Sequence, residues 1–196
     1  MLTPFSDRSK VWEIDGMSLR RLASVSLGER LDPWKLAPKV GLRVMDFESV
    51  LANLSREERL HLLRTAQTSW SGGVYPRTLP DGSRVCLLNS NHSYRRRKIT
   101  LMEEICHIHL KHAPSGLSIA ADGVQVREYL AKQEEQAYGV GAAALMPWQT
   151  LFPALNRGAA IDELAETYDV TTELVTYRIK ITGAYRLYEA RRRRRA

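Results

Sequence analysis

The chain has 196 residues, 44% of them hydrophobic, and a formal net charge of +7. Nine basic residues stand in two tracts, at 95–98 and 191–195, and without them the remaining chain carries a net charge of −2. This uneven distribution argues against a broadly basic nucleic-acid-binding domain. No run approaches about 18 apolar residues, which argues against a transmembrane helix.

The start of the chain and the cysteine count favour a cytoplasmic protein. The first twenty residues carry several charges and lack the apolar run of a secretory signal peptide. Two cysteines, Cys86 and Cys106, are too few for a disulfide framework and fit a reducing compartment. We therefore expect a cytoplasmic location and no contact with a membrane.

The first third of the chain predicts helices and one strand. Residues 1–16 are expected to be irregular, and apolar residues at helical spacing predict a helix over 17–31. A turn and a short helix over 34–39 follow, and the alternation at 40–44 predicts a strand. A capping box at the start of 56–67 predicts another helix there.

The middle of the chain predicts a β-hairpin and then a helix. The runs 69–75 and 83–88 have strand character, and the Pro-Asp-Gly sequence at 80–82 supplies a turn. We expect the hairpin to share one small sheet with the strand near residue 42. A loop over 89–93 precedes a helix over 99–112.

The last third predicts helices. A long helix rich in small residues is expected over 126–145, ended by a Met-Pro pair, with a short helix over 150–155. The segments 160–168 and 172–181 resemble a helix-turn-helix pair in length and spacing. The arginine tract at 191–195 is expected to be a disordered tail.

The segment from 100 to 112 carries the candidate chemistry. Glu103 and His107 stand four residues apart, so on a helix they project from one face and could hold one metal ion. Glu104 stands where the general base of an H-E-x-x-H metallopeptidase motif stands. The pattern here is E-E-x-x-H, in which the first histidine is replaced.

Structural interpretations of the same residues remain open. Thr100 and Glu103 could form a capping box, Glu104 could be a solvated helix carboxylate, and His107 could be a hydrogen-bonded core histidine. The other two histidines of the segment are not four residues from His107 and are expected to point elsewhere (His109, His112).

Taken together, residues 30–183 resemble the ImmA/IrrE family of bacterial metallo-endopeptidases. The resemblance rests on several ordered segments: Leu31-Asp32-Pro33, Val40-Gly41-Leu42, Trp70-Ser71-Gly72, Leu87-Leu88-Asn89, the stretch from Arg96 to His107, Glu134-Glu135-Gln136-Ala137 and Leu145-Met146-Pro147. No single segment is specific, but their order and spacing together are.

The resemblance implies an α+β, zincin-like metallopeptidase domain, mostly helical, with a small sheet of one strand plus a β-hairpin, ending in a helix-turn-helix-like pair. On this basis we divide the chain into an irregular N-terminus (1–16), the zincin-like domain (17–157), a C-terminal helix pair packed on it (158–186) and a basic tail (187–196).

The resemblance also implies a metal site, with two departures from the family pattern. Glu103 replaces the first ligand histidine, and the third-ligand glutamate of the family falls on Gln136, beside Glu134 and Glu135. We predict Glu103, His107 and Glu135 as ligands, with Glu134 or Gln136 as alternatives to Glu135.

The departures affect the chemistry of the site. Two carboxylates and one imidazole neutralise more of the ion's charge than two imidazoles and one carboxylate, so the metal is a weaker Lewis acid. Zinc is expected, and the harder oxygen ligands also suit Mn²⁺ or Fe²⁺. A degenerate relative without metal is the alternative.

Other parts of the chain suggest contacts with partners. An exposed edge strand at Trp70, Gly72 and Gly73 could pair with an extended substrate, although these residues could equally cover the core. The basic tract Arg95, Arg96 and Arg97 could attract an acidic partner or be a solvated loop. The tail at 191–195 could bind nucleic acid weakly and without specificity.

The resemblance implies hydrolysis of a peptide bond in a bacterial, XRE-type helix-turn-helix repressor, with Glu104 as the base. The alternative is a catalytically degenerate family member that regulates by binding a repressor or DNA. The helix pair at 160–181 is acidic in its first helix, so we expect it to pack rather than to read DNA.

Overall fold

The computed structural model describes residues 3–46, 70–113, 116–119, 125–128 and 130–193. The helix expected over 56–67 lies outside the described residues. The chain divides into two compact units: one is Pro33–Ala137, and the other joins Met1–Asp32 to Tyr138–Ala196. The boundary between the units falls within a helix near residue 137. The domain bounds expected from the sequence (1–16, 17–157, 158–186 and 187–196) stay a prediction.

The unit Pro33–Ala137 is built on a three-stranded sheet. Its strands are β1 (Leu42–Asp46), β2 (Gly72–Thr78) and β3 (Arg84–Leu88), in the order β1-β3-β2. β1 is parallel to β3, and β2 and β3 form the antiparallel hairpin that the sequence predicts. The hairpin turn is stabilised by Asp81, whose carboxylate accepts hydrogen bonds from the backbone and hydroxyl of Ser83.

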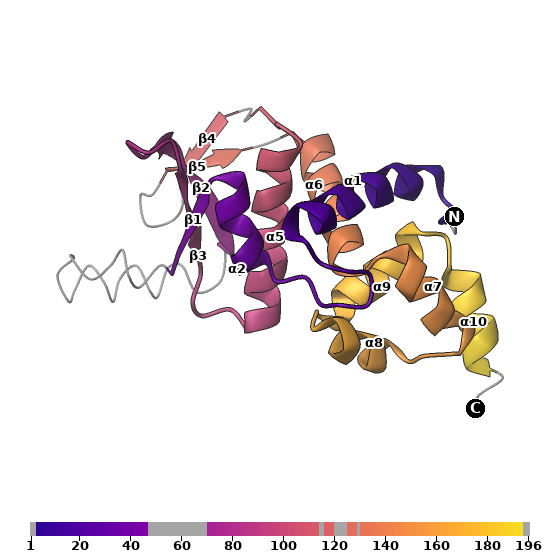
Figure 1. Cartoon of the computed structure of the whole chain (residues 1–196). Coiled ribbons are helices and arrows are strands. Elements are labelled where there is room, and N and C mark those ends of the chain that lie inside the picture. Colours follow the sequence, from indigo (N-terminus) through magenta and orange to yellow (C-terminus); the bar gives the residue numbers. More distant parts are fainter. Residues whose placement is uncertain (1–2, 47–69, 114–115, 120–124, 129, 194–196) are drawn as a thin grey trace. The chain divides into compact units, whose positions relative to one another are not determined.

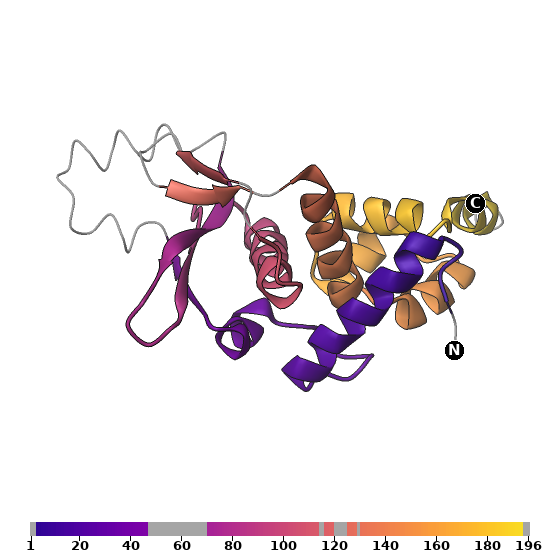
Figure 2. The ribbon, with the colours of Figure 1, turned by 90° about the horizontal axis from the view of Figure 1, so that it is seen from above.

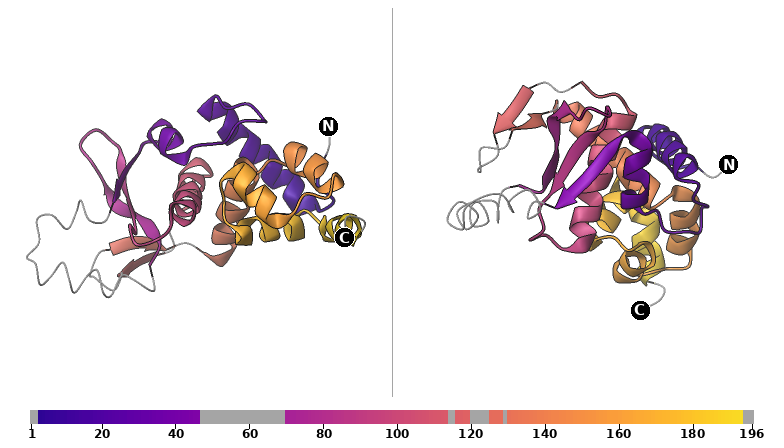
Figure 3. Two further views of the ribbon diagram at one scale, coloured as in Figure 1. Left: turned by 90° about the horizontal axis from the view of Figure 1, so that it is seen from below. Right: turned by 60° about the vertical axis from the view of Figure 1, so that its left-hand side comes forward.

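Helices cover this sheet. α2 (Pro33–Leu36) and the 3-10 helix η1 (Ala37–Val40) precede β1, and α5 (Tyr94–His109) lies along one face of the sheet (Figure 1 and Figure 3). α5 packs its apolar side chains in the core: Leu101, Met102, Ile105 and Cys106 are fully buried. At Gly72 of β2 an added Cβ would lie 2.7 Å from Thr100 Cγ2 of α5, so glycine permits the close approach.

The long helix expected over 126–145 is wrong in its first part. A two-stranded antiparallel sheet, β4 (Gly116–Ile119) with β5 (Gln125–Glu128), comes first, and α6 spans Ala131–Leu145. Apolar residues at positions 126, 129 and 130 imitate helical spacing, but the segment 125–128 finds a strand partner instead. The expected end at the Met-Pro pair is confirmed.

The other unit begins with α1 (Asp7–Ala23). The expectation of an irregular stretch over 1–16 is therefore wrong from Asp7 onward, and the helix expected over 17–31 is confirmed only as far as Ala23. Most residues on the buried face of α1 are polar or small, so its sequence lacks the apolar periodicity that predicts a helix. The buried residues are Ser9, Trp12, Glu13, Gly16, Leu19 and Arg20. An added Cβ at Gly16 would lie 2.8 Å from the backbone nitrogen of Ala144, so α1 packs closely on the end of α6.

The rest of this unit is helical (Figure 2). It contains α7 (Trp148–Asn156), α8 (Ile161–Tyr168), α9 (Thr172–Ile181) and α10 (Tyr185–Arg193). The predicted pair of helices is confirmed as α8 and α9. The expectation of a disordered arginine tail is wrong for Arg191, Arg192 and Arg193, which continue α10.

A buried ion pair ties the helices of this unit together. Arg178 of α9 donates to the carboxylate of Glu13 on α1 and to the carbonyl of Met146, the latter at 2.9 Å. The other oxygen of Glu13 accepts from the backbone N–H of Trp148 at 3.0 Å. The buried charges are thus paired and hydrogen-bonded, as burial in a core requires.

The fold is mostly helical with a small mixed sheet, which confirms the predicted α+β class. Within the described part of the chain, no helix combines the length and the apolar character needed to cross a bilayer.

Candidate active site

The E-E-x-x-H segment lies in the second half of α5. The helix begins at Tyr94, and Ser93 caps it by accepting a hydrogen bond from the N–H of Arg96 at 3.3 Å. Thr100 therefore stands inside the helix, and the capping-box interpretation of Thr100 and Glu103 is wrong. The Glu103 side chain is therefore not required to cap the helix.

Glu103 and His107 lie one turn apart on α5, as their spacing predicts. His107 is buried, with 1% of its side chain exposed, and Glu103 is partly buried. Burial, and then the negative charge of Glu134 on α6, raise the pKa of the Glu103 carboxyl group to about 7. The elevated pKa therefore reflects mainly the loss of solvent around the Glu103 carboxyl group, and secondly the neighbouring carboxylate.

The chain reverses after α5 and returns a second histidine to the site. Lys111 adopts a left-handed backbone conformation with φ +56°, and the N–H of His112 donates to the carbonyl of His107 at 3.0 Å. Such a reversal closes many helices. It places His112 Nδ1 3.0 Å from His107 Nδ1. The expectation that His112 points elsewhere is therefore wrong.

The hydrogen bonds of His112 determine which ring nitrogens carry protons. Burial, and then the charge of His107, lower the pKa of His112, so this ring is neutral near pH 7. His112 Nε2 lies 3.3 Å from the side-chain oxygen of Gln136, which can only accept a hydrogen bond. His112 therefore donates from Nε2 and accepts at Nδ1, and His107 donates from its own Nδ1.

The remaining nitrogen of His107 then faces a carboxylate. His107 Nε2 lies 3.4 Å from Glu134 Oε2 on α6. In a neutral His107 this nitrogen carries a lone pair, so two electron-rich atoms face each other unless a cation lies between them. That cation is either a proton on His107 or a metal ion. Two ligands on one tetrahedral zinc ion, at about 2.1 Å each, stand about 3.4 Å apart.

The donor chemistry thus fits a divalent metal ion, and the ligand set is incomplete as it stands. Among the residues that the structure describes, no three His, Cys, Asp or Glu side chains are arranged as a ready metal site. His107 and Glu134 meet at a suitable separation, and Glu103 is close enough to Glu134 for their charges to interact.

The structure separates the three candidates for the third ligand. Glu134 faces His107, and Gln136 faces His112. Glu135, our first choice from sequence, is exposed on α6. The geometry therefore favours Glu134 over Glu135, and the binding of a metal by either residue stays a prediction.

Glu104, the predicted base, lies on the part of α5 that faces the sheet. Burial, and then the charge of Glu104, raise the pKa of the Cys86 thiol on β3 well above its usual range. The carboxylate of Glu104 therefore lies near the middle strand of the sheet. Cys86 and Cys106 are both buried and are not joined in a disulfide, as expected of structural cysteines.

The predicted substrate strand coincides with an outer strand of the sheet. β2 pairs only with β3 among the described strands of this sheet, and β5 lies beside β2. Gly73 is buried and Gly72 is packed against α5, while the carbonyl of Trp70 accepts from Asn89 at 2.8 Å. Packing therefore explains the two glycines, and substrate pairing stays a prediction.

The basic tract is helical and not a loop. It forms the first turn of α5, where Arg96 donates to the Ser71 hydroxyl at 3.1 Å and Arg97 pairs with Asp46 at 3.0 Å. Arg95 is half-buried in the same turn. With a rise of 1.5 Å per residue, Arg96 lies about 16 Å along the helix from His107. The tract is therefore remote from the candidate metal ligands.

Comparisons with known proteins agree with this arrangement. The sequence profile of the IrrE N-terminal-like domain matches residues 57–180, which include α5 and α6. The curated protein sequences give no match. A solved structure described as a Mycobacterium tuberculosis transcriptional regulator is similar with a TM-score of 0.50 and 17% sequence identity.

The structural match covers 89% of this chain and 48% of the regulator, so the chain spans about half the length of that protein. At this identity the similarity concerns the fold alone. The family profile covers well over half of the chain, and its matched region contains the E-E-x-x-H helix and the facing Glu134. The chain is a member of the ImmA/IrrE family, whose profile is that of the IrrE N-terminal-like peptidase domain.

Proposed function

We propose that the chain is a metallo-endopeptidase that hydrolyses a peptide bond in a bacterial helix-turn-helix repressor. The observation that carries this proposal is the position of His107 Nε2, which lies 3.4 Å from Glu134 Oε2 on the facing helix, a separation that suits two ligands of one metal ion. Membership of a peptidase family supports the same assignment.

In this proposal His107 and Glu134 hold the metal ion, and Glu103 completes the set. A bound divalent ion supplies the Lewis acid that makes water a nucleophile near neutral pH. Glu104 accepts the proton of the attacking water and delivers it to the leaving amine. His112 and Gln136 hold the ring of His107 in the orientation and tautomer that a ligand requires.

Metal content tests the first part of this proposal. Protein purified without chelator is expected to contain about one equivalent of zinc, manganese or iron by elemental analysis. Glu134→Gln and His107→Gln are expected to lose the metal. Glu135→Gln is the matched control, because Glu135 is the exposed neighbour of Glu134 on α6. Equal metal loss in all three variants contradicts the assignment.

Cleavage tests the second part. Incubation with the repressor encoded beside the gene is expected to give cleavage at one site, which chelation stops. Glu104→Gln is expected to abolish the cleavage and to retain the metal, because a base is removed and the ligands remain. Cleavage by Glu104→Gln at the wild-type rate removes Glu104 as the base.

A second function is favoured by the incomplete ligand set. Among the described residues no three potential ligands are arranged around one point, and a carboxylate replaces the first histidine of the motif. Both facts suit a degenerate family member that binds a repressor or DNA without cutting. Stable binding of the repressor without metal and without cleavage supports this function and contradicts the first.

A further inference from the structure

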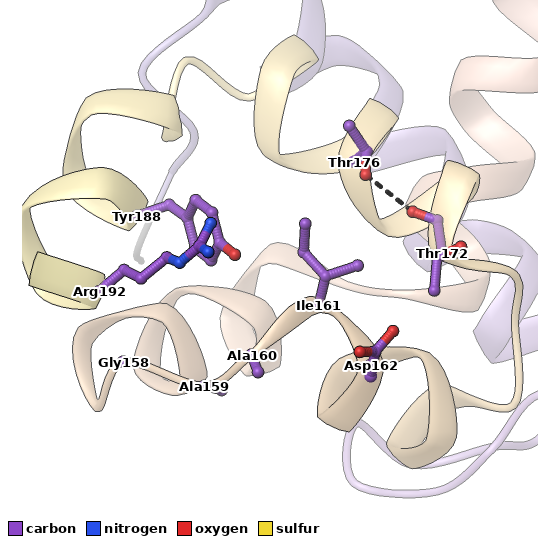
Figure 4. A pocket seen from close by; sticks show the side chains of 9 residues that line it. All are labelled: Gly158, Ala159, Ala160, Ile161, Asp162, Thr172, Thr176, Tyr188 and Arg192. Atoms are coloured by element: carbon purple, nitrogen blue, oxygen red, sulfur yellow. Dashed lines mark hydrogen bonds between the residues drawn. The ribbon is translucent and has the colours of Figure 1, made fainter. Parts of the chain in front are cut away.

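A cavity of about 690 Å³ lies in the unit that contains the C-terminal helices. The cavity is open to solvent and is lined by the loop before α8, the first turn of α8, one face of α9 and the end of α10 (Figure 4). Its volume is typical of pockets that bind small molecules. The candidate active site lies in the other unit, so this cavity is unrelated to the proposed catalysis.

One buried side chain presents a polar atom to this cavity. Tyr188 of α10 is 6% exposed, and its hydroxyl points toward the cavity and Ile161 (Figure 4). The hydroxyl has no hydrogen-bond partner among the described residues. The hydroxyl oxygen is not one of the buried polar atoms that lack a partner, so it is open to the cavity and accessible to water or a ligand there.

Two opposite charges line the same cavity without pairing. Arg192 enters from α10, beside Tyr188, and Asp162 enters from the first turn of α8. Neither side chain makes an ion pair or a hydrogen bond with any residue that the structure describes. The cavity is therefore bipolar, with a cation and a hydroxyl donor at one end and a carboxylate at the other.

Between these ends the cavity is lined by apolar groups and by a hydroxyl group that already has a hydrogen-bond partner in the protein. Ile161 projects into the middle, and two alanines of the preceding loop complete the lining. On the α9 side, the Thr176 hydroxyl donates to the backbone carbonyl of Thr172 at 2.9 Å. A ligand that fits has two opposite charges separated by a short aliphatic part.

We propose that this pocket binds a zwitterionic ligand of the amino-acid or short-peptide class. The ligand carboxylate lies at Arg192 and the Tyr188 hydroxyl, the ligand ammonium lies at Asp162, and the aliphatic part covers Ile161. Arginine with a hydroxyl donor is a strong partner for a carboxylate. A simple anion is disfavoured because Asp162 faces it.

A nucleic-acid backbone is also disfavoured at this pocket. The first turns of α8 expose three carboxylates toward solvent, and these repel phosphate groups: Asp162, Glu163, Glu166. Nucleic-acid binding through Arg192 is nevertheless an outcome that the following experiment detects.

Calorimetric titration with three tripeptide probes tests the proposal. Ala-Ala-Ala is expected to bind, whereas its N-acetylated form and its C-terminal amide are each expected to bind about tenfold more weakly, because each lacks one charged partner. Arg192→Gln is expected to remove the difference between the free acid and the amide. Asp162→Asn is expected to remove the difference between the free and the acetylated amine.

Comparison of the three probes across the variants distinguishes a loss of ligand binding from a loss of protein structure. Arg186→Gln on α10 is the matched control, because Arg186 is exposed on the same helix and does not line the cavity. Tyr188→Phe is expected to weaken the free acid and to leave the amide unchanged. Equal binding of all three probes, no heat with any probe, or salt-sensitive duplex DNA binding that Arg192→Gln abolishes each overturns the proposal.

Discussion

Replacement of Glu103 by glutamine in metal-free protein is expected to increase stability in a pH-dependent way. The pKa of this carboxyl group is about 7 in the folded protein, because of burial and the charge of Glu134, against 4.5 in the unfolded chain. Since one pKa unit corresponds to about 1.4 kcal/mol, the ionised group costs the folded protein about 3 kcal/mol.

The sign follows from the order of ionisation. Below pH 4.5 the carboxyl group is protonated in both the folded and the unfolded protein, so its ionisation does not lower the stability of the wild type. Between pH 4.5 and 7 the unfolded chain ionises first, so the stability of the wild-type protein falls as pH rises. The glutamine variant has no such group, and its advantage over the wild type grows over this interval and is constant above it.

Urea unfolding in the presence of chelator, followed by tryptophan fluorescence from pH 4 to pH 8.5, measures this difference. The free energy of unfolding of Glu103→Gln minus that of the wild type is expected to rise by about 3 kcal/mol between the ends of the range. Glu135→Gln, at the exposed neighbouring position, is expected to give a small and constant difference. A flat profile for Glu103→Gln refutes the placement of Glu103 beside Glu134 in a buried site.

Three further variants test other parts of the structure. His112→Phe is expected to weaken metal binding about 10- to 100-fold in competition with a chelator, because the ring that orients His107 is lost; unchanged affinity contradicts the tautomer assignment. Gly139→Ala is expected to lower the free energy of unfolding by about 1–3 kcal/mol, since the new Cβ would lie 2.2 Å from the buried ring of Trp12, and full stability would falsify this packing. Arg178→Met is expected to cost about 3–5 kcal/mol in urea unfolding, because it leaves the Glu13 carboxylate buried without its cation, so a loss below about 1 kcal/mol speaks against the buried pair.

Much of the fold follows from local sequence patterns. The hairpin β2–β3, the short helix pair α8–α9 and the end of α6 at a Met-Pro pair depend on turn residues and apolar spacing, which act over a few positions. Local patterns did not predict the first half of α1, because its buried face contains Ser9, Glu13 and Arg20. The burial of these polar residues depends on partners far along the chain. Hydrophobic periodicity carries no information about such partners.

The candidate site was predictable in part. The four-residue spacing of Glu103 and His107 placed both on one face of a helix, and the family resemblance pointed to residues 134–136. His112 was missed because its approach to His107 depends on the left-handed backbone of Lys111, which lysine rarely adopts and no sequence pattern signals. The choice of Glu134 over Glu135 depends on the rotation of α6 about its axis, which spacing alone leaves open.

The loss of stability caused by ionised Glu103 allows one stability measurement to distinguish between the two candidate functions. Two carboxylates, Glu103 and Glu134, share a partly buried site, so the metal-free protein is less stable when Glu103 is ionised. A metal ion removes this cost, because it pairs with both carboxylates and with the lone pair of His107. If saturating zinc stabilises the wild type above Glu103→Gln at pH 8, the site is built for a cation, as catalysis requires. If zinc leaves the order of the two proteins unchanged, the carboxylates serve no metal, and the regulatory function becomes the better explanation.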